Sequence, residues 1–208
     1  LEGPRRPGCV GVPLPGVSVD VVADDGHPCG PGEPGELRVK TAQMMSGYHG
    51  DAEATARAFD EAGRFRTGDV GVLETFAEGP PAFRLLGRAS SDILKSGGYK
   101  LSALEIEAVL REHPAIADVA VVGTPDDTWG ELVTACVVLR SGATLSLDEL
   151  RAFSRDALAA YKLPRALALF PELPRNAMGK LQKQDVRRLL ASGAPNVPFV
   201  RHGDGGRP

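Results

Sequence analysis

The stretch that decides the fold is Leu101-Ser102-Ala103-Leu104-Glu105, which two apolar, β-branched runs follow at Ile116–Val122 and Leu132–Leu139. Its serine and glutamate have the spacing of a capping box, in which two side chains bond the unpaired N–H groups at a helix start. We expect a helix from here to about Glu112, because a proline two residues later disfavours further helix. The two apolar runs are typical of buried strands. This stretch therefore predicts one helix packed on a sheet.

The same signals recur toward the C-terminus. Ser146-Leu147-Asp148-Glu149 repeats the capping box and predicts a helix that ends near Ala160. A short strand over Ala166–Phe170 and a final helix over Lys183–Leu190 complete the pattern. Strand and helix alternate over about 100 residues, which predicts a compact α+β domain. We assign this domain to residues 88–190.

The upstream part, residues 1–87, is predicted to be rich in strands. After a Gly/Pro-punctuated loop over residues 1–16, we expect strands at 17–22, 36–39, 70–75 and 83–86, and a short helix at 51–59. The expected fold class is therefore α+β, with a β-rich region before the smaller α+β domain. Gly, Pro and Asn dominate residues 191–208, which predicts a disordered tail.

Charge and hydropathy exclude two classes of partner. The formal net charge of −3 gives no electrostatic footprint for nucleic acid. We expect no transmembrane segment, because no apolar run approaches the roughly 20 residues that a membrane helix needs.

The metal-ligating residue types are dispersed. Cys9, Cys29 and Cys136 form no CxxC pair, and the four histidines are scattered, so we expect no metal site. Unpaired thiols favour a reducing compartment, such as the cytoplasm or the mitochondrial matrix. The chain opens at Leu1 in mid-pattern, so we expect that an N-terminal portion, with any targeting signal, precedes it.

Two polar residues end or precede strands in the first half. Asp69, in Thr67-Gly68-Asp69, could accept hydrogen bonds from two hydroxyls, as a ribose would offer. The alternative is a turn aspartate that bonds its own backbone. Arg88 follows Gly87 at a strand end and, taken alone, is equally well explained as a surface arginine.

Two glycine-containing segments in the second half offer flexible backbone. Ser96-Gly97-Gly98-Tyr99-Lys100 could allow close approach of a ligand, or could be an ordinary turn. In Pro174-Arg175-Asn176-Ala177-Met178-Gly179-Lys180, the lysine could swing onto a phosphate or carboxylate and neutralise developing charge. The alternative is a solvated lysine ahead of the basic residues Lys183, Arg187 and Arg188. We ascribe Glu105 and Glu107 to helix capping and solvation.

In their order and spacing, the Thr67–Asp69, Gly87–Lys100 and Pro174–Lys180 segments resemble the C-terminal part of the adenylate-forming enzymes, the acyl-CoA synthetases and their relatives. The whole segment is most similar to the malonyl-CoA synthetase branch. The resemblance implies the β-rich end of the large N-terminal domain, followed by the small, mobile C-terminal domain.

For the nucleotide, the resemblance implies that Asp69 holds the ribose hydroxyls of ATP and AMP and that Arg88 also contacts the nucleotide. A hinge would follow directly, and we place it at Ser90. Here the sequence Ala89-Ser90-Ser91-Asp92 departs from the pattern of many relatives, which carry Asp or Lys two residues after the arginine. This departure leaves the hinge position open by about one residue.

For the acyl group and CoA, the resemblance implies that Lys180 is the catalytic lysine of adenylation. The backbone of Gly97 and Gly98 would face the pantetheine arm of CoA. Lys95 and Lys100 are candidate phosphate contacts.

We therefore expect a fragment of an ATP-dependent acid–CoA ligase, which forms acyl-AMP and then acyl-CoA, with Mg²⁺ accompanying ATP. Malonate is the favoured small carboxylate, and the fragment alone should be inactive. One alternative is an adenylation domain that loads a carrier protein, although no serine-bearing carrier segment follows Leu190. The other is a truncated, non-catalytic binding domain.

Overall fold

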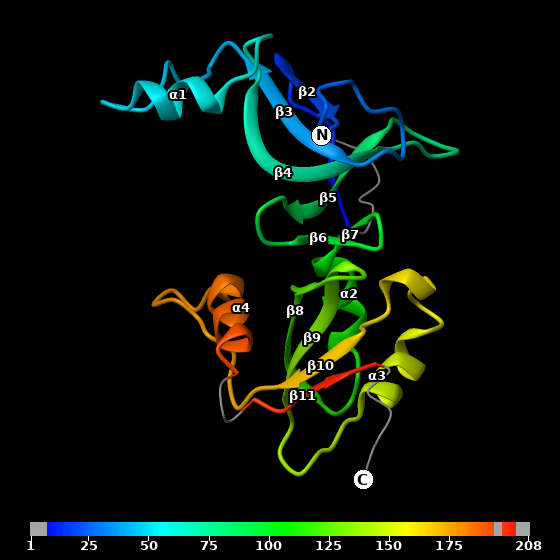
Figure 1. Ribbon diagram of the computed structural model, residues 1–208. Helices are drawn as coiled ribbons and strands as arrows, with labels where there is room; N and C mark the ends of the chain where they lie inside the picture. The colour runs from blue at the N-terminus through cyan, green and yellow to red at the C-terminus, as the bar shows by residue number, and fades with distance from the viewer. Residues whose placement is uncertain (1–7, 194–196, 203–208) are drawn as a thin grey trace. The chain divides into compact units, whose positions relative to one another are not determined.

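The computed structural model describes residues 8–193 and 197–202. The chain divides between Ser90 and Ser91 into two compact units, which we call unit 1 and unit 2 (Figure 1).

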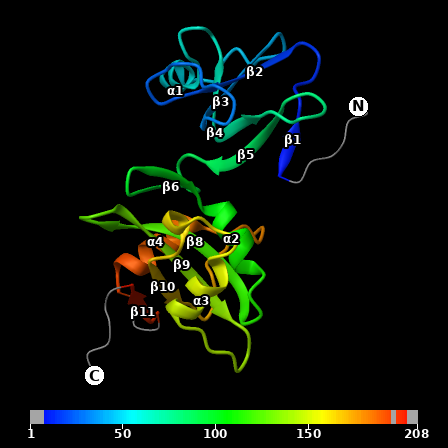
Figure 2. The ribbon, with the colours of Figure 1, turned by 90° about the vertical axis from the view of Figure 1, so that its right-hand side faces the viewer.

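Unit 1 is built on one antiparallel sheet of five strands in the order β1-β5-β4-β3-β2 (Figure 2). The strands are β1 (Cys9–Gly11), β2 (Val17–Val22), β3 (Gly35–Thr41), β4 (Phe65–Glu74) and β5 (Ala82–Arg88). The helix α1 (Ala52–Ala58) starts as predicted at Asp51, whose carboxylate accepts a 2.7 Å hydrogen bond from the Ala54 N–H. The core of this unit is small and centres on Val21, Leu37 and Phe83.

Unit 2 alternates strands and helices, as expected from the sequence. Its elements are β6 (Ile93–Ser96), β7 (Tyr99–Ser102), α2 (Ala103–Arg111), β8 (Ile116–Asp126), β9 (Gly130–Leu139), α3 (Leu147–Ser154), β10 (Ala166–Leu169), α4 (Lys183–Ala191) and β11 (Phe199–Arg201), with a 3₁₀ turn at Ala160–Lys162. β8 and β9 pair antiparallel along most of their length, and β10 runs parallel to β9.

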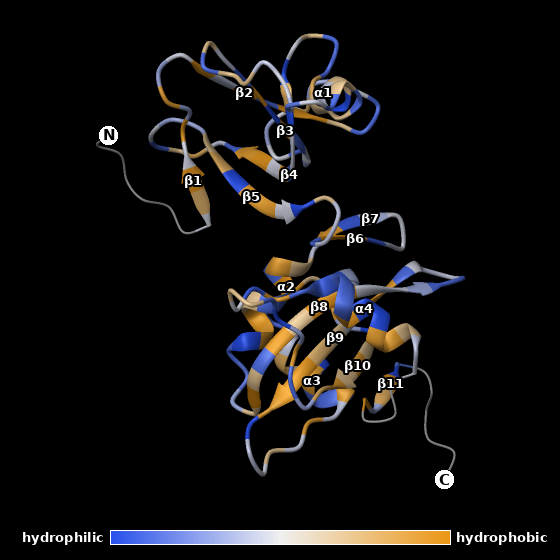
Figure 3. Ribbon diagram, turned by 90° about the vertical axis from the view of Figure 1, so that its left-hand side faces the viewer, coloured by the Kyte–Doolittle hydropathy of each residue, from blue (hydrophilic) through white to orange (hydrophobic). Residues whose placement is uncertain are grey.

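Side-chain alternation along β8 buries both faces of the unit 2 sheet. Val119 and Val121 pack in a cluster with α2 and α3, whereas Ala120 and Val122 pack in a second cluster with Val186 of α4. Figure 1 accordingly shows α4 on one side of β8–β10 and α2 and α3 on the other. The middle parts of the central strands are mostly hydrophobic (Figure 3), as expected for a sheet covered on both faces.

The two predicted helix caps are confirmed, although only one is a complete box. At Ser146 the hydroxyl accepts from the Glu149 N–H at 3.2 Å, and the Glu149 carboxylate accepts from the Ser146 N–H at 2.8 Å. At Ser102 the hydroxyl accepts from the Glu105 N–H at 3.2 Å, but the Glu105 carboxylate instead pairs with Lys162 at 2.6 Å. A lysine from another element thus takes the place of the reciprocal bond.

The Gly97-Gly98 segment is the tight turn of the β6–β7 hairpin, which is the turn alternative of the sequence-based expectation. The C-terminal tail and the N-terminal loop differ from that expectation. In the expected disordered tail, Phe199–Arg201 forms β11 and pairs with β10, because the β10 edge offers unpaired backbone groups. Residues 194–196 and 203–208 of that tail lie outside the described residues. β1 forms within the predicted N-terminal loop and pairs with β5.

Among the residues at 8–193 and 197–202, no helix is both long and apolar enough to cross a membrane.

Candidate functional site

Asp69 and Arg88 lie directly opposite each other where β4 and β5 pair. The Arg88 Nε is 2.7 Å from Asp69 Oδ1, and the same guanidinium donates a 3.0 Å hydrogen bond to the Thr67 carbonyl. About a third of the Asp69 side chain remains exposed. Because a carboxylate has four lone-pair sites, one ion pair leaves acceptors for further donors. The structure therefore brings together the two residues that the sequence proposed for the nucleotide.

The backbone around Asp69 is fixed by its neighbours. The Thr67 hydroxyl donates to the Leu37 carbonyl at 2.7 Å and accepts from the Asp69 N–H at 3.0 Å. Gly68 has a φ of 71°, and its N–H donates to the Glu36 carboxylate at 3.2 Å. Glycine suits this left-handed conformation. The Thr-Gly-Asp sequence thus holds the carboxylate in place, and Glu36 is a supporting residue that the sequence did not reveal.

The β6–β7 hairpin brings four predicted residues together. Gly97 and Gly98 have φ values of 58° and 82°, and positive φ at both central residues is what a two-residue type I′ turn requires. The Gly97 N–H donates to the Trp129 carbonyl at 2.9 Å, and a Cβ on Gly97 would lie 3.0 Å from the Trp129 ring. A Cβ on Gly98 would meet nothing within 4 Å. Gly97 is therefore packed against the Trp129 ring, whereas Gly98 faces open space.

Lys95 and Lys100 are register partners on this hairpin, and both are exposed. Their neighbours Leu94 and Leu101 are buried on the opposite face. Like charges directly opposite each other on paired strands are destabilising. The hairpin therefore presents two lysines on its exposed face, where a phosphate could reach them.

An aromatic pair beside the hairpin was missed by the sequence analysis. The rings of Tyr99 and Tyr161 stack with centroids 4.5 Å apart, and their residues are 54% and 42% exposed. Sixty-two positions separate them in the sequence, so no local pattern predicts the contact. The stacked rings give an apolar surface next to the two lysines.

Lys180 lies on an exposed but ordered turn. The Asn176 side chain accepts hydrogen bonds from the N–H groups of Met178 at 3.0 Å and of Lys180 at 2.9 Å. The Arg175 guanidinium bonds the Gly179 carbonyl at 2.8 Å and the Asp118 carboxylate at 2.6 Å. The backbone is therefore held to β8 while the lysine side chain is presented to solvent.

Glu107 was expected to be solvated, but it is buried together with Lys183. The Lys183 ammonium lies 2.7 Å from Asp92 and 2.7 Å from Glu107, and all three side chains are less than 15% exposed. Glu107 also accepts from the Val121 N–H at 2.8 Å. We call Lys183, Asp92 and Glu107 the buried triad. It ties the start of α4 to α2 and to the first residues of unit 2.

The buried triad lies near Cys136, and burial raises the pKa of the Cys136 thiol well above its usual range. The Glu107 charge raises this pKa further, and the Lys183 charge opposes the shift. The thiol is therefore kept protonated and unreactive.

The predicted site residues thus fall into three groups. Asp69 and Arg88 form a pair in unit 1. Lys95, Gly97, Gly98 and Lys100 share the β6–β7 hairpin of unit 2, and Lys180 lies on a separate turn of that unit, before α4.

Comparison with known proteins identifies the family. Residues 1–49 match the model of the AMP-binding enzyme family, and residues 105–180 match the model of the AMP-binding enzyme C-terminal domain. The chain belongs to the AMP-binding enzyme family. The resemblance inferred from the sequence and the α+β fold class are confirmed.

The relatives of this AMP-binding chain include acid–CoA ligases. The mitochondrial malonate–CoA ligase of Bos taurus is 44% identical over 220 residues, which cover 95% of this chain and 37% of the relative. The crystal structure of ATP-bound MatB from Rhodopseudomonas palustris superposes with a TM-score of 0.78 at 34% identity, over 90% of this chain and 36% of that one. The o-succinylbenzoate CoA synthetase of Bacillus subtilis, solved with an acyl-adenylate intermediate, gives a TM-score of 0.75 at 34% identity, over 86% of this chain and 35% of that one. The chain therefore spans little more than a third of the length of the relatives it matches.

Proposed function

We propose that this chain is the C-terminal part of an ATP-dependent acid–CoA ligase that forms acyl-AMP and then acyl-CoA. Malonate is the favoured acid, because the bovine relative at 44% identity is named a malonate–CoA ligase. The observation that carries the proposal is the exposed Lys180 on a turn whose backbone is held by Asn176 and Arg175. A fixed backbone with a mobile cationic tip suits neutralisation of charge that develops in a reaction.

In the first step, Lys180 would hold the acid and the α-phosphate of ATP while pyrophosphate leaves. Asp69 would accept hydrogen bonds from the ribose hydroxyls, and Arg88 would orient that carboxylate through the 2.7 Å ion pair. Mg²⁺ would accompany ATP as part of the substrate. A carboxylate already paired with a guanidinium is a poor ligand for Mg²⁺, so we assign no ligand of this ion to Asp69.

In the second step, the β6–β7 hairpin would receive CoA. The Gly97-Gly98 backbone would line the path of the pantetheine arm, because the open side of Gly98 admits close approach. The exposed Lys95 and Lys100 would contact the phosphates. The stacked Tyr99 and Tyr161 rings would support the apolar face of the adenine.

The anchoring of the segment between the units supports a hinge at Ser90. On the unit 1 side, the Ala89 N–H donates to the Gly68 carbonyl at 2.9 Å. On the unit 2 side, the Ser91 carbonyl accepts from Arg187 at 3.0 Å, and Asp92 belongs to the buried triad. Ser90 thus lies between the two anchored positions, where a change in backbone conformation disturbs the fewest of these contacts.

The test uses the full gene product that contains this chain. ATP- and CoA-dependent thioester formation is measured with malonate, methylmalonate, acetate and a medium-chain acid. We expect malonyl-CoA from the parent protein and a loss of about 10²–10³ in rate for Lys180→Ala. Arg188→Ala, which removes an exposed charge from the neighbouring α4, serves as the matched control and should keep the parent rate.

Three outcomes distinguish the parts of the proposal. Thioester formation from another acid retains the ligase and rejects malonate. Normal activity of Lys180→Ala rejects the role of the lysine. Formation of neither adenylate nor thioester from any of the acids rejects the acid–CoA ligase.

A further inference from the structure

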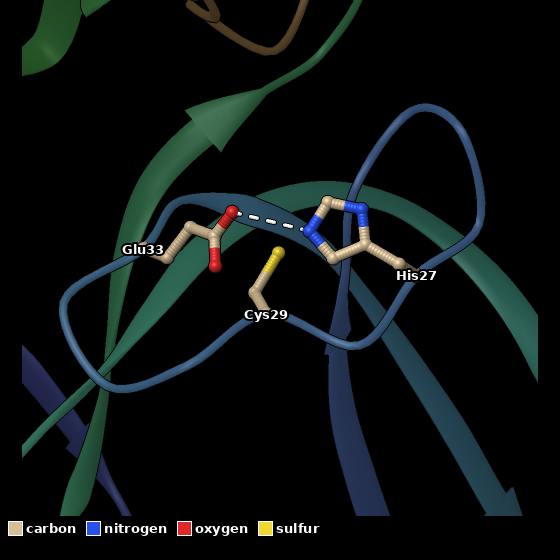
Figure 4. Close-up of side chains that lie close together, drawn as sticks. All are labelled: His27, Cys29 and Glu33. Carbon is tan, nitrogen blue, oxygen red and sulfur yellow. Dashed lines mark hydrogen bonds and ion pairs between the residues drawn. The ribbon is translucent and has the colours of Figure 1, made fainter.

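The connection between β2 and β3 gathers three different metal-ligand side chains. His27, Cys29 and Glu33 each offer one ligand atom, and the three atoms lie within 4.8 Å of one another. Figure 4 shows the Cys29 sulfur pointing into the space between the His27 ring and the Glu33 carboxylate. The set thus combines a nitrogen, a sulfur and an oxygen around one point.

The backbone of this connection is held in place by several hydrogen bonds. The Ala23 N–H donates to the His27 carbonyl at 3.0 Å, and the Cys29 N–H donates to the Val21 carbonyl at 2.8 Å. The Gly30 N–H donates at 3.0 Å to the second oxygen of Glu33. The three side chains are therefore presented by ordered turns, and little chain entropy remains to be lost on binding a ligand.

The orientation of His27 is that of a metal ligand with a supporting carboxylate. Its Nδ1 lies 2.6 Å from Asp25, and its Nε2 lies 3.3 Å from Glu33. When Nδ1–H donates to Asp25, the lone pair of neutral histidine is on Nε2 and points toward Glu33. A carboxylate on the far nitrogen commonly fixes the tautomer and ring of a zinc-bound histidine.

One of the three separations between ligand atoms has the value that a small tetrahedral ion requires. Tetrahedral zinc with nitrogen, oxygen and sulfur ligands places the ligand atoms about 3.3–3.6 Å apart. The His27 to Glu33 separation of 3.3 Å already meets this value. A ring nitrogen and a thiolate favour zinc over the harder Mg²⁺ and Ca²⁺.

We propose that His27, Cys29 and Glu33 form a binding site for one Zn²⁺ ion, with Asp25 as the supporting carboxylate and water as the fourth ligand. This site goes beyond the ligase activity proposed above and does not depend on it. The sequence predicts no metal site, because its cysteines form no CxxC pair and its histidines are scattered. The turn brings Glu33 back to His27 and Cys29, and neither of those patterns includes a glutamate.

Binding must displace protons as well as water. Zinc requires a neutral His27 and the thiolate form of Cys29. The carboxylates of Asp25 and Glu33 must also be ionised. The affinity for zinc should therefore increase as the pH rises.

The test is a titration of the metal-free chain with Co²⁺, followed by displacement with Zn²⁺. We expect one equivalent of Co²⁺ to give a thiolate-to-cobalt absorption band, which Zn²⁺ then abolishes. His27→Ala and Cys29→Ser should remove the band, and Asp25→Asn should weaken binding by about tenfold. Cys9→Ser is the matched control, because Cys9 is the other partly buried cysteine of unit 1 and should not affect the band.

Circular dichroism of each variant shows whether it is folded, and thermal unfolding gives a second measurement. Zinc should raise the melting temperature of the parent and of Cys9→Ser, but not that of folded His27→Ala. The proposal is overturned if no thiolate band forms, if the band survives in Cys29→Ser, or if Cys9→Ser loses it equally.

Discussion

At the scale of single residues, the two glycines of the β6–β7 turn have different reasons for being glycine. Both have positive φ, where an L side chain costs roughly 1–2 kcal/mol. Only Gly97 also faces an aromatic ring, with a Cβ position 3.0 Å from Trp129. The Trp129 ring has little freedom to move away, because the Arg165 guanidinium lies 3.5 Å from its centroid.

We predict that Gly97→Ala lowers the free energy of unfolding more than Gly98→Ala does. The conformational cost is shared, and Gly97→Ala adds an overpacking cost of roughly 1–3 kcal/mol. Urea unfolding of the two variants measures the difference. Gly98→Asn is the control and should recover stability, because asparagine tolerates positive φ better than alanine. Equal losses for the two alanine variants would contradict the Trp129 argument.

Asp60 is a second residue whose role can be predicted from its surroundings. Burial raises the pKa of Asp60, but the Arg64 N–H and the guanidinium groups of Arg38 and Arg64 outweigh this effect, so the net pKa is far below the usual range. The carboxylate lies 3.0 Å from Arg38 and 2.8 Å from Arg64. Because the folded-state pKa is depressed, Asp60 stabilises the fold above its unfolded pKa of about 3.9 and loses that contribution as the pH falls below it.

We predict that Asp60→Asn lowers the free energy of unfolding by about 3–5 kcal/mol at pH 7, because it leaves the buried Arg38 without one of its carboxylates. The difference between parent and variant should shrink as the pH is lowered below about 3.9, because the unfolded parent then binds a proton at Asp60 that the folded parent takes up only at much lower pH. Urea unfolding as a function of pH measures both effects. A difference that stays constant down to acidic pH would show that the Asp60 charge is not responsible.

At the scale of the elements, the sequence predicted what local patterns encode. The caps at Asp51, Ser102 and Ser146 and the apolar, β-branched runs of β8 and β9 are determined by neighbours within a few residues. The Gly97-Gly98 turn was left as one of two alternatives, because a glycine pair is equally compatible with a flexible loop and only its pairing partners distinguish the two. The buried triad was missed because Lys183 is 91 positions from Asp92, and no local signal joins them.

We predict that Lys183→Met lowers the free energy of unfolding by about 3–5 kcal/mol, because it leaves Asp92 and Glu107 buried without their cation. Combining it with Asp92→Asn and Glu107→Gln should restore part of this loss, since the charges disappear while hydrogen-bonding groups remain. Chemical denaturation of the three proteins gives the comparison. Arg188→Ala, on the exposed side of α4, should change stability by less than about 0.5 kcal/mol. A loss in Arg188→Ala as large as that in Lys183→Met would contradict the triad argument.

At the scale of the whole molecule, the candidate site was predictable only as separate pieces. The order of the Thr-Gly-Asp, Gly-Gly and Gly-Lys motifs was enough for the family, which the comparisons confirm. The partnership of Asp69 with Arg88 and the register of Lys95 with Lys100 required the strand pairing. The stacking of Tyr99 on Tyr161 required the packing of a 3₁₀ turn against a hairpin, which no pattern in the chain describes.

The division of the site between two elements of unit 2 leads to a prediction for the full gene product. Lys180 is on the turn before α4, and the paired lysines and stacked tyrosines are on and beside the β6–β7 hairpin. If the Lys180 turn serves adenylation and the β6–β7 hairpin serves the reaction with CoA, substitutions should separate the two half-reactions. We predict that Lys180→Ala lowers the rate of ATP–pyrophosphate exchange by about 10²–10³ but still converts supplied acyl-AMP and CoA into thioester. Tyr161→Ala should keep the exchange and raise the KM for CoA about tenfold, as expected for roughly 1.4 kcal/mol of lost stacking.

Phe153→Ala is the matched control, because Phe153 is 40% exposed on α3 and contacts His113, so both half-reactions should keep parent values. If Lys180→Ala and Tyr161→Ala impair both steps to the same extent, the hairpin and the lysine turn act as one site, and their assignment to separate steps is wrong.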